Sequence, residues 1–326
     1  ASAPEAASSG APPSRAPRAA LPLTLPGGAP GIGFDDLRFV PSLDRVLVPG
    51  GRSGALFVVD PTTRAVEAIG GFSQSASFAG GHDFGVTSAD AAGRRAFATD
   101  RTSKKLVVVD LDQKKIVAAA ALGADPDYVR FVAPTNELWV TEPDAQRIEI
   151  FSLAAAAPKK VADVAVPGGP ESLVVDAARG RAYTHAWKGA TFVVDVKTRA
   201  VVTKYENGCE GSRGIDLDEK GETLFVGCAE GKAFALDPAT GRVLGRALTG
   251  NGVDIIAYAP ARRHLYVPAA KAATTTVLAV SPRGELTPVA TLPAAKGSHC
   301  AASDAAGRAF VCDPSSGSLL AIDDVE

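Results

Sequence analysis

Acidic residues, histidines and one arginine recur along this sequence roughly every 40 to 50 positions, and together they could form one mixed nitrogen and oxygen site. Imidazoles with carboxylates suit zinc, copper or manganese, and sites with fewer imidazoles suit calcium. The candidate set is Asp35, His82, Asp83, Asp127, Glu171, Arg213, Asp254 and His299. If a divalent metal binds, the ligands that we favour are His82, Asp83, Asp254 and His299.

The charges of this set leave several interpretations open. Close carboxylates raise one another's pKa values, and a bound metal ion or cationic ligand would compensate them. Arg213 could instead neutralise its acidic neighbours, or hold a carboxylate or phosphate of a ligand through its planar guanidinium. The set could equally line a hydrated channel in which polar side chains solvate ordered water.

A second group of residues is expected at the same end of the molecule, because it follows the next strand of each repeat back toward that face. The group is Asp100, Glu142, His185, Cys228 and Asp313. His185 could face the site, whereas His264 occupies a position held by arginine or glutamate in other repeats and is expected to be structural. Trp187 lies in a predicted loop and could contact a ligand or partner, while Trp139 is expected in the core.

Seven similar segments explain how residues so far apart in sequence could meet. Each contains a short strand centred on a large apolar residue, and the intervals between these markers are 50, 42, 44, 42, 41 and 44. The markers are Leu47, Phe97, Trp139, Tyr183, Phe225, Tyr266 and Phe310. This period is typical of a four-stranded blade, so the sequence predicts an all-β, seven-bladed β-propeller whose innermost strands line a central channel.

Most repeats end their third strand with an aspartate followed by turn residues. These aspartates are Asp60, Asp110, Asp195, Asp237 and Asp323, and serines 152 and 281 take the place in the other two repeats. A short acidic or hydroxyl side chain accepts hydrogen bonds from turn amides, so we expect a structural role for them.

The seventh repeat lacks a fourth strand, because the sequence stops at Glu326 just after the third. Residues 21–25 resemble fourth strands of other repeats and are expected to complete the last blade. Closure would hide two sheet edges, so removing residues 21–26 should destabilise the whole ring.

The repeated pattern D-x-x-x-x-R-x-Y/F-V, followed by V-V-D-x-x-T, resembles the YncE-like or YVTN-repeat family of bacterial propellers over residues 21–326. The resemblance implies a propeller fold and an exported protein. It implies no particular activity, because one fold supports many functions.

The four cysteines lie on either side of two predicted hairpins. Cys209 and Cys228 flank the first hairpin of blade five, and Cys300 and Cys312 flank that of blade seven, within plausible disulfide reach. Four cysteines allow three pairings, and hairpin geometry favours this one. A thiolate metal site is the competing interpretation, but no C-x-x-C or H-x-x-x-H spacing supports it. Two disulfides would fit an oxidising compartment.

Composition and charge limit the partners and the cellular location that we expect for this chain. The 326 residues carry a net charge of −2 and no long apolar run, which disfavours nucleic-acid partners and a transmembrane segment. The chain begins with Ala1 and contains no methionine, as expected after removal of a signal peptide. Residues 1–20, rich in Ala, Ser and Pro, are expected to form a disordered tether. In the precursor this tether could carry a lipid anchor. We expect a periplasmic or secreted location.

Three functions fit these features. The first is a non-enzymatic binding protein that holds a small molecule or metal ion at the acidic mouth of the channel, with protein partners on the blade edges. The second is a metal-dependent hydrolase, lactonase or lyase that uses the same channel. The third is a protein-interaction scaffold. No nucleotide-binding glycine loop or G-x-S-x-G motif is present.

Overall fold

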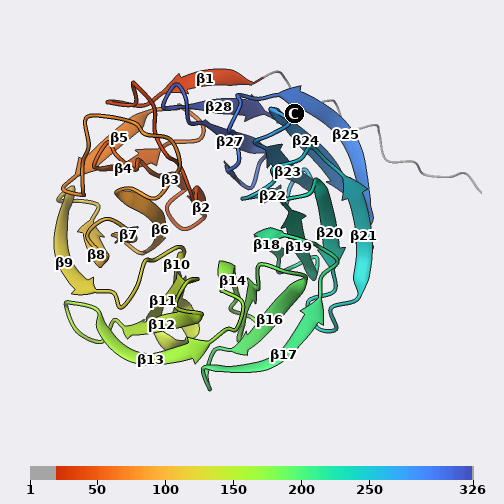
Figure 1. The fold of residues 1–326 in the computed structure, drawn as a ribbon, viewed down its shortest axis with the longest axis horizontal. Coiled ribbons are helices and arrows are strands. Elements are labelled where there is room, and N and C mark those ends of the chain that lie inside the picture. The colour runs from red at the N-terminus through yellow and green to blue at the C-terminus, as the bar shows by residue number, and fades with distance from the viewer. Residues whose placement is uncertain (1–19, 325–326) are drawn as a thin grey trace, which may run out of the picture.

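The computed structural model describes residues 20–324, which form seven four-stranded antiparallel sheets arranged in a ring (Figure 1). The predicted seven-bladed propeller is therefore confirmed. The expected tether falls almost entirely outside the described residues and stays a prediction. Within residues 20–324, no helix has the length and hydropathy needed to cross a bilayer.

The first three blades follow one another along the chain, each with its strands in sequence order from the axis outward. A single 3-10 turn, η1 (Ala133–Thr135), interrupts the first hairpin of blade three. Their strands are β2 (Arg38–Val40), β3 (Arg45–Pro49), β4 (Ala55–Val59) and β5 (Val66–Gly70); β6 (Val86–Ala92), β7 (Arg95–Asp100), β8 (Lys105–Asp110) and β9 (Lys115–Ala121); and β10 (Val129–Val132), β11 (Glu137–Glu142), β12 (Arg147–Ser152) and β13 (Lys159–Ala165).

The next three blades repeat this order, and the last blade differs because its outermost strand comes from the other end of the chain. The strands are β14 (Glu171–Asp176), β15 (Arg181–His185), β16 (Ala190–Asp195) and β17 (Ala200–Glu206); β18 (Ser212–Asp218), β19 (Thr223–Cys228), β20 (Lys232–Leu236) and β21 (Val243–Leu248); β22 (Ala257–Ala259), β23 (His264–Ala269), β24 (Thr274–Val280) and β25 (Leu286–Pro293); and β26 (Ala301–Ser303), β27 (Arg308–Asp313), β28 (Ser318–Asp323) and β1 (Leu21–Thr24).

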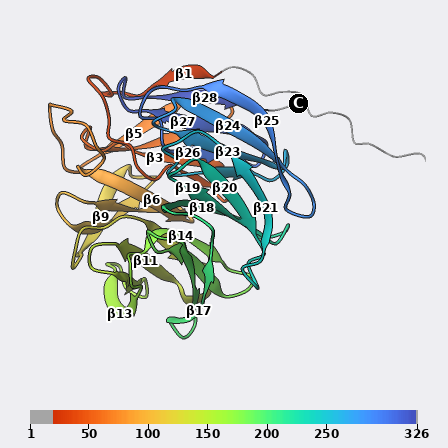
Figure 2. The same cartoon turned by 45° about the vertical axis from the view of Figure 1, so that its right-hand side comes forward.

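The ring closes as the sequence predicts. Strand β1 pairs antiparallel with β28, with Leu21 opposite Ala321 and Thr24 opposite Ser318. In Figures 1 and 2 the red β1 lies along the blue β28, so the two ends of the described chain meet in one blade. The pairing removes the free edge that β28 would otherwise present to solvent.

Apolar residues on the middle strands fill the spaces between blades. All seven aromatic or leucine markers are buried, and Trp139 is fully buried as expected. Four of the five aspartates at the third-strand ends bind turn amides: Asp60, for example, accepts from Thr62 and Thr63, and Asp237 accepts from Ala239 and Thr240. Their structural role in these turns is confirmed, whereas the carboxylate of Asp323 pairs with Arg64.

Both predicted cysteine pairs form disulfides. The Cα atoms of Cys209 and Cys228 are 5.3 Å apart, and those of Cys300 and Cys312 are 5.6 Å apart. Each pair joins the entry of an innermost strand to the neighbouring second strand. The bridges therefore fix the backbone at the entrance to blades five and seven.

Candidate functional site

The candidate residues lie where the chain enters the innermost strand of each blade. Asp35 precedes β2, Asp127 precedes β10, Glu171 begins β14 and Asp254 precedes β22. Because the blades are arranged radially, these entrances surround one mouth of the axis, where there is a cavity of about 630 Å³. Residues lining it include Asp35, His82, Asp83, Asp127, Glu171 and Asp254.

Two other candidates lie at the edge of this mouth. Arg213 on β18 has its Nε 3.7 Å from a carboxylate oxygen of Glu171. The rings of His299 and His82 are 5.4 Å apart between centroids. All eight predicted residues are therefore connected to the same mouth, although they do not all line the cavity.

His82 and Asp83 reach the mouth from a long segment between β5 and β6 that contains no strand. This segment accounts for the longest interval in the sequence repeat. The side chain of Asp83 is 86% exposed, so it faces solvent at the rim. His82 turns inward, and its Nδ1 lies 3.2 Å from Asp35 Oδ2.

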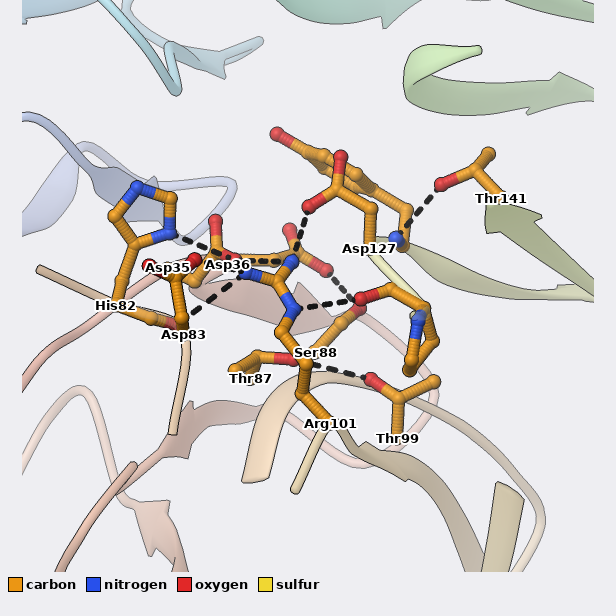
Figure 3. Close-up of polar contacts among 12 residues, drawn as sticks. Asp35, Asp36, His82, Asp83, Thr87, Ser88, Thr99, Arg101, Asp127 and Thr141 are labelled. Carbon is orange, nitrogen blue, oxygen red and sulfur yellow. Dashed lines mark hydrogen bonds and ion pairs between the residues drawn. The ribbon is translucent and has the colours of Figure 1, made fainter. Parts of the chain in front are cut away.

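Arg101 is the central cation of this mouth, and sequence reasoning missed it. Figure 3 shows its guanidinium between Asp35, Asp83 and Asp127. Its Nη2 is 3.2 Å from Asp35 Oδ2 and 2.7 Å from Asp127 Oδ1, and its Nε donates to the Pro126 carbonyl oxygen at 2.7 Å. The side chain is only 11% exposed, so these charges interact in a partly desolvated setting.

Asp35 is the carboxylate of the mouth whose charge is best compensated by nearby cations. Burial alone would raise the pKa of this carboxyl, but His82 and Arg101 outweigh burial, and the pKa is lowered. The same pairing acts on His82: the charge of Asp35 and its contact with the ring raise the pKa of His82 to about 10. Asp35 and His82 therefore form an ion pair at neutral pH.

The other three carboxyls of the mouth are compensated less completely, although Arg101 also contacts Asp127. Burial raises the pKa of Asp127 well above its usual range, and the charges of Asp35 and Glu171 add to the effect. Burial and the charge of Asp254 raise the pKa of Glu171 to about 7. Burial also raises the pKa of Asp254, and among residues 20–324 no hydrogen bond or ion pair engages its carboxylate.

An exposed aromatic ring lies beside these carboxyls. The indole Nε1 of Trp187 donates a hydrogen bond to Glu171 Oε2, and Trp187 also lines the cavity. The backbone amide of Trp187 donates a hydrogen bond to the Gly168 carbonyl oxygen. Trp187 therefore lies next to Glu171, where it could contact a ligand in the cavity, as expected.

Fewer side chains could bind a metal ion together than the sequence suggests. Ligand atoms of His82, Asp254 and His299 lie within 4.8 Å of one another, while Asp83 points away to Arg101. Both ring nitrogens of His299 face carbonyl oxygens, Nδ1 at 2.6 Å from Gly297 and Nε2 at 3.0 Å from Phe34. Carbonyl oxygens only accept hydrogen bonds, so a metal would have to displace one of these contacts.

The ends of the second strands lie toward this face, as expected, but their side chains are engaged locally. Asp100 accepts from the amides of Ser73 and Ser103, and Glu142 accepts from the Ala124 amide and from Arg147. Cys228 is in a disulfide, and Asp313 binds Ser315 and Ser316 in its turn.

The two remaining histidines are internal. His185 is buried between Thr191 and the Gly214 carbonyl, and burial lowers its pKa to about 4. It does not face the mouth. His264 contacts Asp324, which also accepts from the Tyr266 hydroxyl, so its structural role is confirmed.

Comparison with known proteins agrees with this architecture. No family model matches the chain. Over 152 residues it is 29% identical to the uncharacterized protein YncE of Salmonella typhi and to that of Salmonella typhimurium, which covers 43% of the chain and 43% of each relative. The chain is a β-propeller that is similar to YncE over this segment. It matches less than half the length of these curated relatives, whose printed names assign no activity.

Solved structures add support for the propeller fold of this chain. A chain of a mitotic checkpoint complex aligns with a TM-score of 0.75 over 100% of this chain and 97% of its own, at 14% identity. The Cps50 (Swd1) propeller domain of Myceliophteria thermophila gives 0.71 over 91% and 98%, at 14% identity. Hydrazine synthase of Kuenenia stuttgartiensis gives 0.72 over 90% and 95%, at 14% identity. At such low identity these likenesses concern the fold alone.

Proposed function

We propose that this propeller is a binding protein that holds a small cationic ligand at the mouth of the axis lined by Asp127, Glu171 and Asp254. We call this site the carboxylate mouth. The observation that carries the proposal is the raised pKa of all three carboxyls around one cavity. A carboxyl with a raised pKa binds protons more readily than usual because its charge is uncompensated. A bound cation would supply the missing charge and take the place of the protons.

The distribution of protein cations supports this assignment. Arg101 is shared between Asp35 and Asp127, His82 pairs with Asp35, and Arg213 approaches Glu171 only at 3.7 Å. Glu171 and Asp254 thus face the cavity with the least compensation. The least compensated negative charge therefore lies at the entrances to blades four and six, which carry Glu171 and Asp254.

An organic ammonium ion fits this end better than a bare metal ion. The cavity volume of about 630 Å³ is in the range of small-molecule sites, and the Trp187 ring offers an aromatic face beside Glu171. The carbonyl contacts of His299 also disfavour metal ligation. Zinc, copper or calcium at His82, Asp254 and His299 remains the competing occupant.

Isothermal titration calorimetry with putrescine tests the proposal, with uncharged 1,4-butanediol as the matched probe. We expect binding of the diamine only, and at least tenfold weaker binding by Glu171→Gln. Glu285→Gln, which alters an exposed residue in a blade-six turn, is the control and should bind as the parent does. Equal binding of both probes, or no effect of Glu171→Gln, would reject the cation site.

A metal-dependent hydrolase is the second candidate. Two observations favour it: the His82, Asp254 and His299 grouping, and the pKa of about 7 for Glu171, which suits a general base near neutral pH. Elemental analysis of protein purified without chelators would reveal a stoichiometric metal. Metal-dependent ester or lactone cleavage that is lost in Glu171→Gln would replace the binding proposal with this one.

The proposed location is the periplasm or the extracellular space. Two disulfides support it, because such bonds persist in oxidising compartments and are rare in the cytosol. The similarity to YncE-like propellers is compatible with export. Thiol alkylation followed by mass mapping of native protein tests this location, and four free thiols would contradict it.

A further inference from the structure

A second cavity, of about 540 Å³, lies at the opposite end of the innermost strands. Its lining includes the ends of these strands and the turns of their first hairpins, such as Pro41 after β2 and Asp218 at the end of β18. We call it the hairpin-side chamber. Tyr128 is the single residue that lines both this chamber and the carboxylate mouth, so the two cavities are chemically separate.

The walls of the chamber are mainly apolar. They include Leu37, Val174, Ile215, Ile256 and Ala302. Charged and polar residues also line it, among them Arg38, Asp216, Asp218 and Lys220. Small-molecule sites commonly combine apolar walls, which bind the body of the ligand, with polar atoms that fix its orientation. The chamber therefore differs in character from the carboxylate mouth.

Three deeply buried polar atoms of residues that line the chamber have no hydrogen-bond partner among residues 20–324. They are the hydroxyl of Ser303, a residue 6% exposed, the hydroxyl of Tyr258, a residue 7% exposed, and Nε of Arg130, a residue 4% exposed. Buried polar groups without partners are rare because they forfeit the hydrogen bonds that water would provide. A ligand that accepts hydrogen bonds would satisfy them.

Arg38 supplies the available positive charge. Its Nε lies 3.5 Å from Asp90 Oδ1, a long ion pair, and no hydrogen bond within the described chain involves its two terminal nitrogens. Those nitrogens form a planar pair of donors that matches the two oxygens of a carboxylate. Arg38 lines the chamber from the first blade.

The acidic groups deep in the chamber are already engaged. Asp36 binds Arg130 through both oxygens and also accepts from Ser88. Asp216 accepts the amides of Leu217 at 2.8 Å and Tyr258 at 2.6 Å. Asp218 and Glu219, which also line the chamber, accept the amides of Gly221 and Ala177. Because all four carboxylates have partners, the unpartnered donors of Arg38, Arg130 and Ser303 favour an anionic ligand over a cationic one.

We propose that the hairpin-side chamber binds a small carboxylic acid with an aliphatic or aromatic body, its carboxylate on Arg38 and its body against the apolar walls. The Ser303 hydroxyl donates a further hydrogen bond to the ligand. This site is independent of the cation proposed at the carboxylate mouth, and the two could be filled together.

Octanoate is the probe for this proposal, with 1-octanol as its uncharged counterpart, and calorimetry on the full chain is the measurement. We expect octanoate to bind at least tenfold more tightly than the alcohol, because a charged hydrogen bond contributes more than a neutral one. Arg38→Gln should weaken octanoate binding about tenfold or more. Arg45→Gln, a more exposed arginine of the same blade, should leave it unchanged.

Ser303→Ala gives a second test that loss of folding cannot mimic. Because the hydroxyl lacks a partner without ligand, its removal should leave the melting temperature unchanged or higher. Octanoate binding should nevertheless fall severalfold. Glu171→Gln should not affect octanoate, which separates this proposal from the first. Failure of millimolar octanoate to bind, equal binding of octanol, or normal binding by Arg38→Gln would overturn it.

Discussion

Replacing Arg101 by glutamine should destabilise the fold, because the guanidinium compensates two buried carboxylates at once. It lies 3.2 Å from Asp35 and 2.7 Å from Asp127, and it also donates to the Pro126 carbonyl. Removing one partner of a buried ion pair costs about 3 to 5 kcal/mol, and we expect about 3 kcal/mol because His82 still pairs with Asp35. With an unfolding entropy of about 2.1 cal/mol/K per residue, this corresponds to roughly 5 °C in Tm.

The loss should grow with pH. Without Arg101 the pKa values of Asp35 and Asp127 rise in the folded state. A carboxyl whose folded pKa exceeds its unfolded pKa loses stability as pH rises between the two values. The difference in Tm from the parent should therefore be larger at pH 8 than at pH 5, because a smaller fraction of carboxyls with raised pKa values is ionised at the lower pH.

Thermal unfolding followed by circular dichroism at both pH values tests this reasoning. Arg94→Gln is the matched control, because it breaks an exposed arginine–aspartate pair with Asp112 and should give no measurable shift. An Arg101→Gln protein that melts within 1 °C of the parent at pH 8 would refute the central role of Arg101. So would an equal deficit at both pH values.

Three further predictions concern the fold. Deleting residues 21–26 removes β1 and the buried Leu25, and should lower stability by at least about 3 kcal/mol in a thermal melt; a parent-like melt would contradict ring closure. The pKa of His185, lowered to about 4, predicts stability that is complete above pH 6.5 and falls toward pH 4, and His185→Gln should flatten that decline in urea titrations. Reduction should destabilise the protein by about 3 kcal/mol per disulfide, measured by melting with and without reductant.

The fold could be predicted from sequence because each blade repeats the same local chemistry. The markers from Leu47 to Phe310 fix the second strands, and aspartates such as Asp60 fix the turns that follow the third. Once seven blades are counted, radial geometry brings the entrances of the innermost strands together. The candidate residues at the mouth followed from this repetition alone, without knowledge of any side-chain contact.

Features that depend on non-repeating segments could not be predicted. Arg101 follows Asp100 directly, but its partners include Asp83, carried by the strand-free segment between β5 and β6, whose path no repeat specifies. Asp100 and Glu142 lie at the predicted end, but the sequence does not reveal that nearby amides and Arg147 bind their carboxylates. The hairpin-side chamber was missed because its walls are ordinary core residues in the sequence.

The central claim, a cation in place of protons at the carboxylate mouth, is tested most directly by proton release. Putrescine should be titrated calorimetrically at pH 7 in buffers of different ionisation enthalpy. Because the pKa of Glu171 is about 7, binding should release a substantial fraction of a proton, and Glu171→Gln should reduce that release. Binding without proton release, or release unchanged in Glu171→Gln, would contradict the account.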